Sequence, residues 1–271
     1  MSPRMDDALK YGICGCAAVI LTCFLLGVAT REHSWVDRLW SLAPPAYVAW
    51  FASQSGFHDA RLWLMTALAF AWGARLTFNF ARKGGYAKGG EDYRWPILRR
   101  RMTPFQWQLF AFAFVAGIQN VILFLLSLPA WAALQSRVPL NAIDGLAATL
   151  FLLFLAGETI ADEQQWRFHR RKQSALAREK EPESDFCRVG LFRFSRHPNF
   201  FCEQAIWWSF YLFAVAANGA WLQPSIVGPI VLSALFHGST NFTEQITLSK
   251  YPRYAEYQRS TSRLWPWFAR D

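Results

Sequence analysis

Charged residues are scarce in this chain: only 17% of its 271 residues are Asp, Glu, Lys or Arg, whereas about a quarter is usual in a soluble domain. Aromatic residues are abundant instead, with 14 Trp and 24 Phe. The shortage of charge argues against an ordinary cytosolic globule, and the many apolar residues exclude a disordered chain.

Several signature motifs and a cysteine framework are missing as well. The sequence has no GxGxxG, GxxxxGK[ST], HExxH or GxSxG motif, so it signals neither a soluble nucleotide-binding fold nor a standard hydrolase. Five cysteines are an odd number, and three of them lie in one apolar run without a His or carboxylate at ligand spacing. We therefore expect neither a disulfide framework nor a metal site.

The positive charge is segregated along the chain. Of the 28 Lys and Arg residues, 21 lie in three segments, 82–101, 167–196 and 250–270, and long apolar runs separate these segments. A membrane-spanning helix needs about 20 mostly apolar residues. The runs predict about seven spans, near 11–29, 39–54, 62–80, 107–131, 143–161, 204–217 and 222–240.

The placement of charge supports this count, because short cytoplasmic loops collect Lys and Arg. Seven spans put all three basic segments on one side, and the opposite loops then carry only Arg61 and Arg137. We predict a single all-α, polytopic transmembrane bundle with the N-terminus outside and the C-terminus in the cytoplasm. The first residues, MSPRMDDALK, are unlike the basic start of a signal peptide, so the first helix is expected to remain attached.

Polar residues within the spans are candidates for function, because an ionisable group at membrane depth costs at least about 2.5 kcal/mol. Trp72, Arg75, Asn79 and Arg82 share one face of the third span. This face either lines a polar cavity open to the cytoplasm, or Arg75 pairs with an acid such as Asp37 while Arg82 reaches the headgroups.

Glu158 and Asp162 share a helix face at the end of the fifth span. They either balance the basic segment that follows or accept hydrogen bonds from the hydroxyl or amide groups of a ligand.

The densest polar constellation is GLFRFSRHPNFFCEQAIWW, residues 190–208. A helix that begins near Pro198 would align Arg196, Asn199 and Glu203 on one face. The start of such a helix, beside Arg196 and His197, favours an anion. The alternative is a basic turn that contacts anionic lipid.

A second constellation follows the last span. Asn241 and Glu244 share a helix face, and KYPRYAEYQRSTSRLWPWF at 250–268, which includes Tyr254, mixes aromatic and basic residues as interfacial segments do. No nucleic-acid-binding module accompanies it, so we expect membrane lipids and a lipid-like small molecule as partners rather than a nucleic acid, and no protein partner is evident.

These motifs carry a family resemblance. GLFRFSRHPNFFCE and TEQITLSKYPRYAEYQRSTSRLWPW resemble the C-terminal half of the steroid 5-alpha-reductase-like membrane proteins, and more closely the branch designated DUF1295. DRLW at 37–40, GEDYRWPILR at 90–99 and ETIADEQ at 158–164 extend the similarity over most of the chain.

The resemblance implies a helical bundle that binds NADPH from the cytoplasmic side, with a substrate half at 1–140 and a cofactor half at 141–271. Asn199 and Glu203 match the Asn-x-x-x-Glu motif of the reductases that binds NADPH. The other cofactor-binding residues expected on this basis or from the patterns above are Arg75, Glu158, Asp162, Arg170, Arg196, His197, Asn241, Glu244 and Tyr254.

The implied reaction is reduction of a carbon–carbon double bond in a steroid-like or other lipid. The Gln-Glu pair of the steroid enzymes has no counterpart near the second span, and Trp72 stands where those enzymes have a Tyr. Asp37, Tyr86 and Tyr93 are the conceivable acids or hydrogen-bond donors.

Two rival interpretations stay open. RHPNF and YPRYAEY also resemble the membrane methyltransferases that act on isoprenylcysteine or phospholipids with S-adenosylmethionine, and a non-enzymatic membrane protein is the third possibility. The expected location is the bacterial inner membrane, or the endoplasmic reticulum in a eukaryote.

Overall fold

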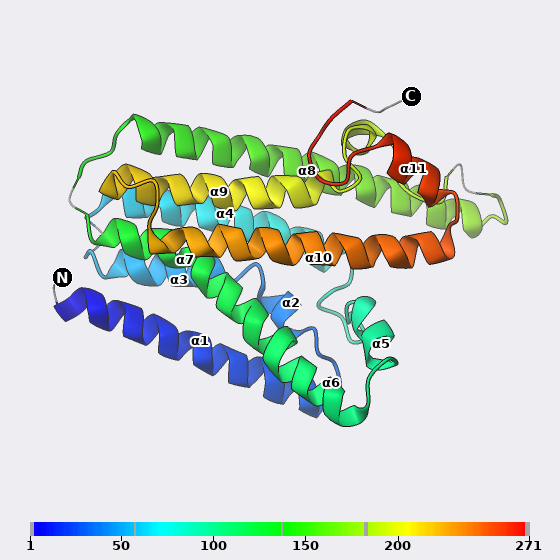
Figure 1. Cartoon of the computed structure of the whole chain (residues 1–271), viewed down its shortest axis with the longest axis horizontal. Coiled ribbons are helices and arrows are strands. Elements are labelled where there is room, and N and C mark those ends of the chain that lie inside the picture. The colour runs from blue at the N-terminus through cyan, green and yellow to red at the C-terminus, as the bar shows by residue number, and fades with distance from the viewer. Residues whose placement is uncertain (1–2, 57, 137, 182–183, 269–271) are drawn as a thin grey trace. The chain divides into compact units, whose positions relative to one another are not determined.

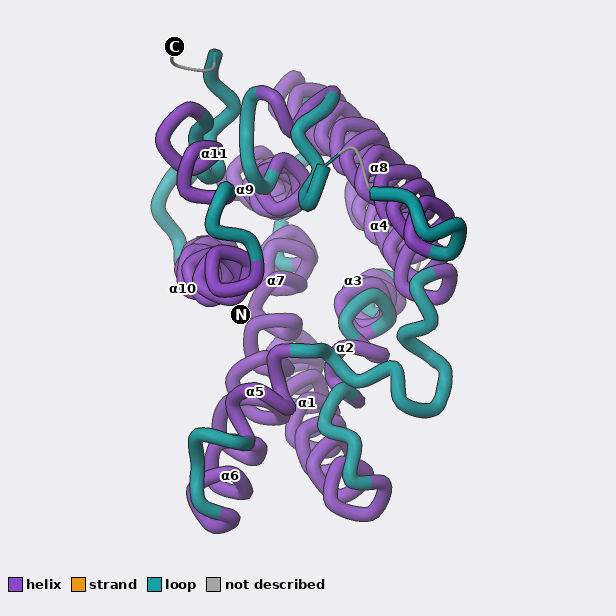
Figure 2. Tube along the Cα trace, turned by 90° about the vertical axis from the view of Figure 1, so that its right-hand side faces the viewer, coloured by secondary structure: helices purple, strands orange, loops and turns teal. Residues whose placement is uncertain are grey.

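The computed structural model describes residues 3–56, 58–136, 138–181 and 184–268, and this part of the chain contains helices and no strand. Figure 2 shows these helices joined by loops. The predicted all-α class is thus confirmed. In chain order the elements are α1 (Pro3–Thr30), α2 (Trp35–Leu39), α3 (Ala43–Ser53), α4 (Ala60–Arg82), α5 (Arg94–Arg99), α6 (Pro104–Phe110), η1 (Ala111–Ile118), α7 (Gln119–Leu134), α8 (Ala142–Leu176), η2 (Gly190–Arg193), α9 (Pro198–Asn218), η3 (Pro224–Ile226), α10 (Val227–Lys250) and α11 (Tyr254–Ser260).

Four helices within the described ranges are long and apolar enough to cross a membrane: Asp6–Thr30, Pro104–Leu134, Ala142–Leu176 and Pro198–Asn218. This finding agrees with a membrane protein. The predicted span 39–54 corresponds to α3, whose 11 residues extend only about 16 Å at 1.5 Å per residue. The count of about seven crossings and the orientation of the termini stay predictions.

Local sequence explains where several helices begin. The Asp59 side chain accepts a hydrogen bond from the Leu62 backbone at 3.0 Å and caps α4. Thr103 and Gln106 form a reciprocal capping box at α6. Proline occupies the first turn of α3 and of α9, where its missing N–H has no helical partner. The predicted helix start at Pro198 is therefore confirmed.

The chain folds into two compact units. The first runs through Ala148 and also includes Trp207–Val231, and the second consists of Thr149–Ile206 and the chain from Leu232 onward. Segment 207–231 thus packs with the N-terminal part of the chain, although the sequence placed it in the C-terminal half.

In the first unit, α3 packs against α4 and α7, and α1 packs against α7 and η1 (Figure 1). The Trp72 and Trp207 rings meet edge to face at 4.8 Å. Arg61 forms a buried ion pair with Asp144, with Nε 2.7 Å from Oδ1. The sequence placed Arg61 in an outside loop with Arg137. Arg61 instead lies in the first turn of α4, whereas Arg137 lies outside the described residues.

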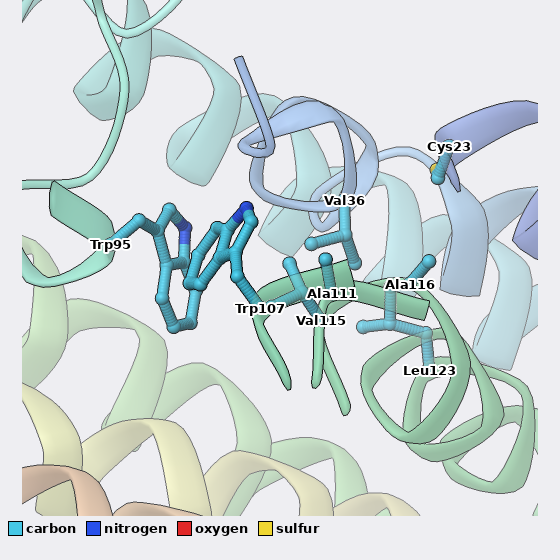
Figure 3. Packing of buried hydrophobic residues seen from close by; sticks show 8 residues of the cluster. All are labelled: Cys23, Val36, Trp95, Trp107, Ala111, Val115, Ala116 and Leu123. Atoms are coloured by element: carbon cyan, nitrogen blue, oxygen red, sulfur yellow. The ribbon is translucent and has the colours of Figure 1, made fainter. Parts of the chain in front are cut away.

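An apolar cluster fills the region where α2, α5, α6 and η1 meet. Trp95 and Trp107 lie close to each other at one end of the cluster, and Val36 and Val115 continue it (Figure 3). It packs the segments 31–42 and 83–103, which contain α2 and α5, against α6 and η1.

In the second unit, a loop after α8 folds back onto that helix. Phe192 and Cys187 pack against Ala161, while Phe186 packs against Tyr254 and Tyr257 of α11. This packing holds the start of α9 and the C-terminal segment in place.

Candidate functional site

The first part of the candidate site is the contact between α8 and α9. A Cβ atom placed at Gly157 would lie only 3.0 Å from the Cys202 sulfur, so the two helices approach closely there. The Phe154 and Phe201 rings meet one turn earlier on α8, with centroids 5.9 Å apart.

Three carboxylates adjoin this contact. Glu158 follows Gly157, Asp162 lies one turn later on α8, and Glu203 follows Cys202; each is 4% exposed. Buried carboxylates are costly unless they accept hydrogen bonds or face a ligand that donates them. The structure thus brings three of the predicted cofactor-binding residues to one helix pair.

Asn199 lies one turn before Glu203 on α9 and is half-buried. Within the described ranges, its carboxamide makes no hydrogen bond to another residue. An amide offers two donors and an acceptor, so this side chain is available to a ligand beside a buried carboxylate.

The second part of the site centres on Glu244 in α10. Arg196 reaches it in a bidentate arrangement, with Nε 2.7 Å from Oε1 and Nη2 3.0 Å from Oε2. His197 Nε2 lies 2.9 Å from Oε1, and Gln258 donates to Oε2 at 2.9 Å. The Tyr254 hydroxyl completes this Glu244 network at 3.3 Å.

The electrostatics follow from these contacts. Burial would raise the pKa of Glu244, but hydrogen bonds from His197, Arg196 and Gln258 outweigh burial and lower the pKa to about 2. Burial and the negative charge of Glu244 raise the pKa of Tyr254, whose hydroxyl stays protonated. The network therefore holds an ionised carboxylate.

Arg196 and His197, which the sequence predicts as receptors for an anion at the start of α9, both contact Glu244 in the structure. These contacts join the residues just before α9 to α10. Binding of an anion by the two residues stays a prediction.

The C-terminal segment also fixes the start of α9. The backbone N–H groups of Arg196 and His197 donate to the carbonyls of Ser262 and Arg263 at 2.8 and 3.1 Å. Arg263 in turn donates to Asn241, one of the residues predicted to bind the cofactor. The structure places Asn241 on the exposed side of α10, whereas Glu244 is buried.

Two residues that sequence reasoning missed complete the second unit. Gln164 accepts a hydrogen bond from the Leu191 N–H at 2.9 Å and ties the loop before α9 to α8. Gln258 contacts Glu244, and its only sequence signal is the spacing of four from Tyr254, which puts both on one face of α11.

The other predicted cofactor residues are Arg170 and Arg75. Arg170 is exposed on α8. Arg75 lies half-buried on α4 in the first unit, between buried Trp72 and buried Asn79. Arg82, the fourth residue of this stripe, donates to the Asn79 side chain at 3.0 Å.

The three conceivable acids lie in the loop region of the first unit. Asp37 accepts a hydrogen bond from the Trp95 indole at 3.3 Å, and burial together with the negative charge of Asp92 raises the pKa of Asp37. The Tyr86 hydroxyl donates to the Arg38 carbonyl at 3.2 Å, and Tyr93 is half exposed at the start of α5.

Comparison with known proteins gives the family. A family model described as "protein of unknown function (DUF1295)" matches residues 23–261. An uncharacterized protein of Schizosaccharomyces pombe is 36% identical over 269 residues, which cover 91% of this chain and 78% of that protein. No solved structure matches the chain. The matched residues include the α8–α9 contact and the Glu244 network, and the chain belongs to the DUF1295 family.

Proposed function

We propose that this protein is a membrane-embedded reductase that uses NADPH to reduce a carbon–carbon double bond in a steroid-like or other lipid. The observation that carries the proposal is the Asn199 carboxamide, which is half-buried and unengaged within the described ranges, one turn from buried Glu203. The resemblance of this motif to the cofactor-binding motif of the steroid reductases supports it.

The donor and acceptor groups at the α8–α9 contact suit NADPH. Its carboxamide and ribose hydroxyls are hydrogen-bond donors, which the carboxylates of Glu158, Asp162 and Glu203 would accept. Its phosphates need cations, and Arg170 and Arg171 are exposed on α8 without an ion pair in the described part of the chain. When bound, NADPH supplies the hydride.

The protein would contribute orientation and the exclusion of water. Asn199 and Glu203 would bind the cofactor from α9, while Arg196 and His197 keep the start of that helix in place through Glu244. A double bond accepts hydride readily only when a conjugated group takes up the charge, so we expect an enone or enoyl lipid.

A thermal-stability titration tests the cofactor. The purified full-length protein is heated with NADPH, NADH or S-adenosylmethionine, and a ligand at 100 times its Kd should add about 2.7 kcal/mol. We expect stabilisation by NADPH. Stabilisation by S-adenosylmethionine alone would favour a membrane methyltransferase and refute the proposal.

Substitution of Asn199 localises the effect. Asn199→Ala should weaken NADPH binding at least tenfold, because one or two hydrogen bonds to the cofactor are lost. Gln245→Ala removes an exposed amide from α10 and serves as the matched control. An unchanged response of Asn199→Ala would place the cofactor elsewhere.

The reaction itself is tested with progesterone, an enone steroid, by mass spectrometry of the product. We expect a gain of two hydrogens at the double bond in the presence of NADPH, and a slower reaction in Asn199→Ala.

A further inference from the structure

A pocket of about 580 Å³ lies in the first unit, and none of its lining residues is one that was assigned to the cofactor. Its walls come from the end of α1, from α2 and from the glycine-rich loop after α4. The lining residues are Thr30, Glu32, Trp35, Arg38, Tyr86 and Lys88. Among them, only Tyr86 is one of the three conceivable acids or hydrogen-bond donors.

The acidic group of the pocket is already engaged. Glu32 Oε2 lies 2.7 Å from Arg38 Nη2, and Glu32 Oε1 accepts the Gly89 N–H at 2.8 Å. The hydrogen bonds from Arg38 and from the Gly89 backbone lower the pKa of Glu32. Its charge offsets that of Arg38.

The groups that stay available in the pocket are cationic donors. Arg38 uses Nε and Nη2 for Glu32 and for the carbonyls of Gly85 and Ala87, but its Nη1 makes no hydrogen bond among the described residues and keeps access to solvent. Lys88 is exposed, and no described carboxylate forms an ion pair with it. A ligand that complements Arg38 Nη1 and Lys88 is an anion.

Two further features of the pocket indicate what kind of molecule bears the anionic group. Thr30 is the last residue of α1, and α1 is one of the helices able to span the membrane, so the pocket lies at the level where a span ends. Trp35 and Tyr86 line it with aromatic rings, and the Arg38 guanidinium stacks 4.6 Å over the Trp35 ring. Trp, Tyr and Lys are typical of the headgroup region of a bilayer.

From this geometry we propose that the pocket binds the phosphate headgroup of an anionic membrane phospholipid. The phosphate is held by Lys88 and Arg38 Nη1, and the Trp35 and Tyr86 rings flank the glycerol. The volume is within the range of small-molecule sites. The site is independent of the proposed reductase activity.

The test uses the full-length protein in a neutral detergent with added phosphatidylglycerol, phosphatidylcholine of the same acyl chains, or inorganic phosphate. Bound lipid is counted by native mass spectrometry, and thermal unfolding is followed in parallel. We expect phosphatidylglycerol to bind and stabilise, whereas the zwitterionic lipid does neither.

Charge substitutions assign the binding to this pocket. Lys88→Gln should weaken phosphatidylglycerol binding about tenfold, Lys88→Arg should retain it, and Lys180→Gln, which removes an exposed lysine of the second unit, should leave it unchanged. Equal effects of Lys88→Gln and Lys180→Gln would overturn the proposal, and so would equal binding of both lipids.

The remaining measurements distinguish a lipid headgroup from inorganic phosphate and from NADPH as the ligand of the pocket. Lys88-dependent stabilisation by inorganic phosphate that matches phosphatidylglycerol would refute a lipid headgroup. NADPH should stabilise Lys88→Gln as it stabilises the unsubstituted protein; a parallel loss would assign the pocket to the cofactor. Failure of NADPH to stabilise any variant would refute the reductase proposal and leave the lipid result standing.

Discussion

Glu244→Gln should destabilise the second unit, because glutamine keeps the shape of the side chain and removes the charge that Arg196 and His197 face. The hydrogen bonds lower the pKa of Glu244 from an ordinary value of 4.5 to about 2. At about 1.4 kcal/mol per pKa unit, the ionised carboxylate contributes about 3 kcal/mol to the folded state at pH 7. This agrees with the cost of breaking a buried ion pair.

The lowered pKa of Glu244 also determines how its contribution to the free energy of unfolding depends on pH. Since the folded-state pKa lies below the unfolded one, the contribution is complete above about pH 4.5 and is lost as the pH falls towards 2. The free-energy difference between the unsubstituted protein and Glu244→Gln should therefore shrink to roughly half between pH 7 and pH 3.

Equilibrium unfolding by guanidinium in a neutral detergent, followed by circular dichroism, measures both quantities. Glu256→Gln is the matched control, because Glu256 is an exposed glutamate on α11. Equal stability of Glu244→Gln and the unsubstituted protein at pH 7 would refute the reasoning. A difference that does not shrink at pH 3 would show that charge is not its cause.

Three further predictions concern packing and topology. Arg61→Ala should lower the free energy of unfolding by about 3–5 kcal/mol in the same assay, because it leaves the Asp144 carboxylate buried without this ion pair; equal stability would contradict the buried pair. Gly228→Ala should lower the free energy of unfolding by about 1–3 kcal/mol, since its Cβ would lie 2.5 Å from the Leu125 carbonyl oxygen. Gly238→Ala, with no atom within 4 Å of its Cβ, should instead raise it by about 0.5–1 kcal/mol, because alanine favours the interior of a helix. The predicted cytoplasmic C-terminus is tested by fusions expressed in a bacterium. Green fluorescent protein fused to the C-terminus should fluoresce, and alkaline phosphatase fused there should be inactive. The reverse result would invert the predicted orientation.

The helices could be predicted from the sequence because their signals are local. Apolar runs marked the regions of α1, α4, α7, α8, α9 and α10, and Pro198 marked the start of α9. The same reasoning overestimated the length of α3, since the apolar run at 39–54 continues through the turn at Trp40–Leu42 that ends α2. The sign of the later start is Pro44–Pro45, which suits the first turn of a helix.

The partners of the polar residues could not be predicted, because they lie far apart in the chain. Arg196 is 48 residues from Glu244, and Arg61 is 83 residues from Asp144. Helical spacing grouped Asn241 with Glu244, but it does not distinguish the exposed position from the buried one. Spacing tells which side chains share a face, and only tertiary packing decides what that face contacts.

The first unit is interrupted in sequence, and this has a consequence for how the protein is made. The Ser136 hydroxyl and the Asn141 amide donate to the carbonyls of Ala217 and Ala216 at 2.6 and 2.9 Å, across 81 and 75 residues of chain. The end of α9 therefore supplies contacts to a part of the unit that is synthesised well before it. The early helices therefore lack these contacts until the intervening chain has been made. A nascent chain stalled before Trp207 would leave the side chains of Ser136 and Asn141 without the carbonyls that they bind in the complete unit.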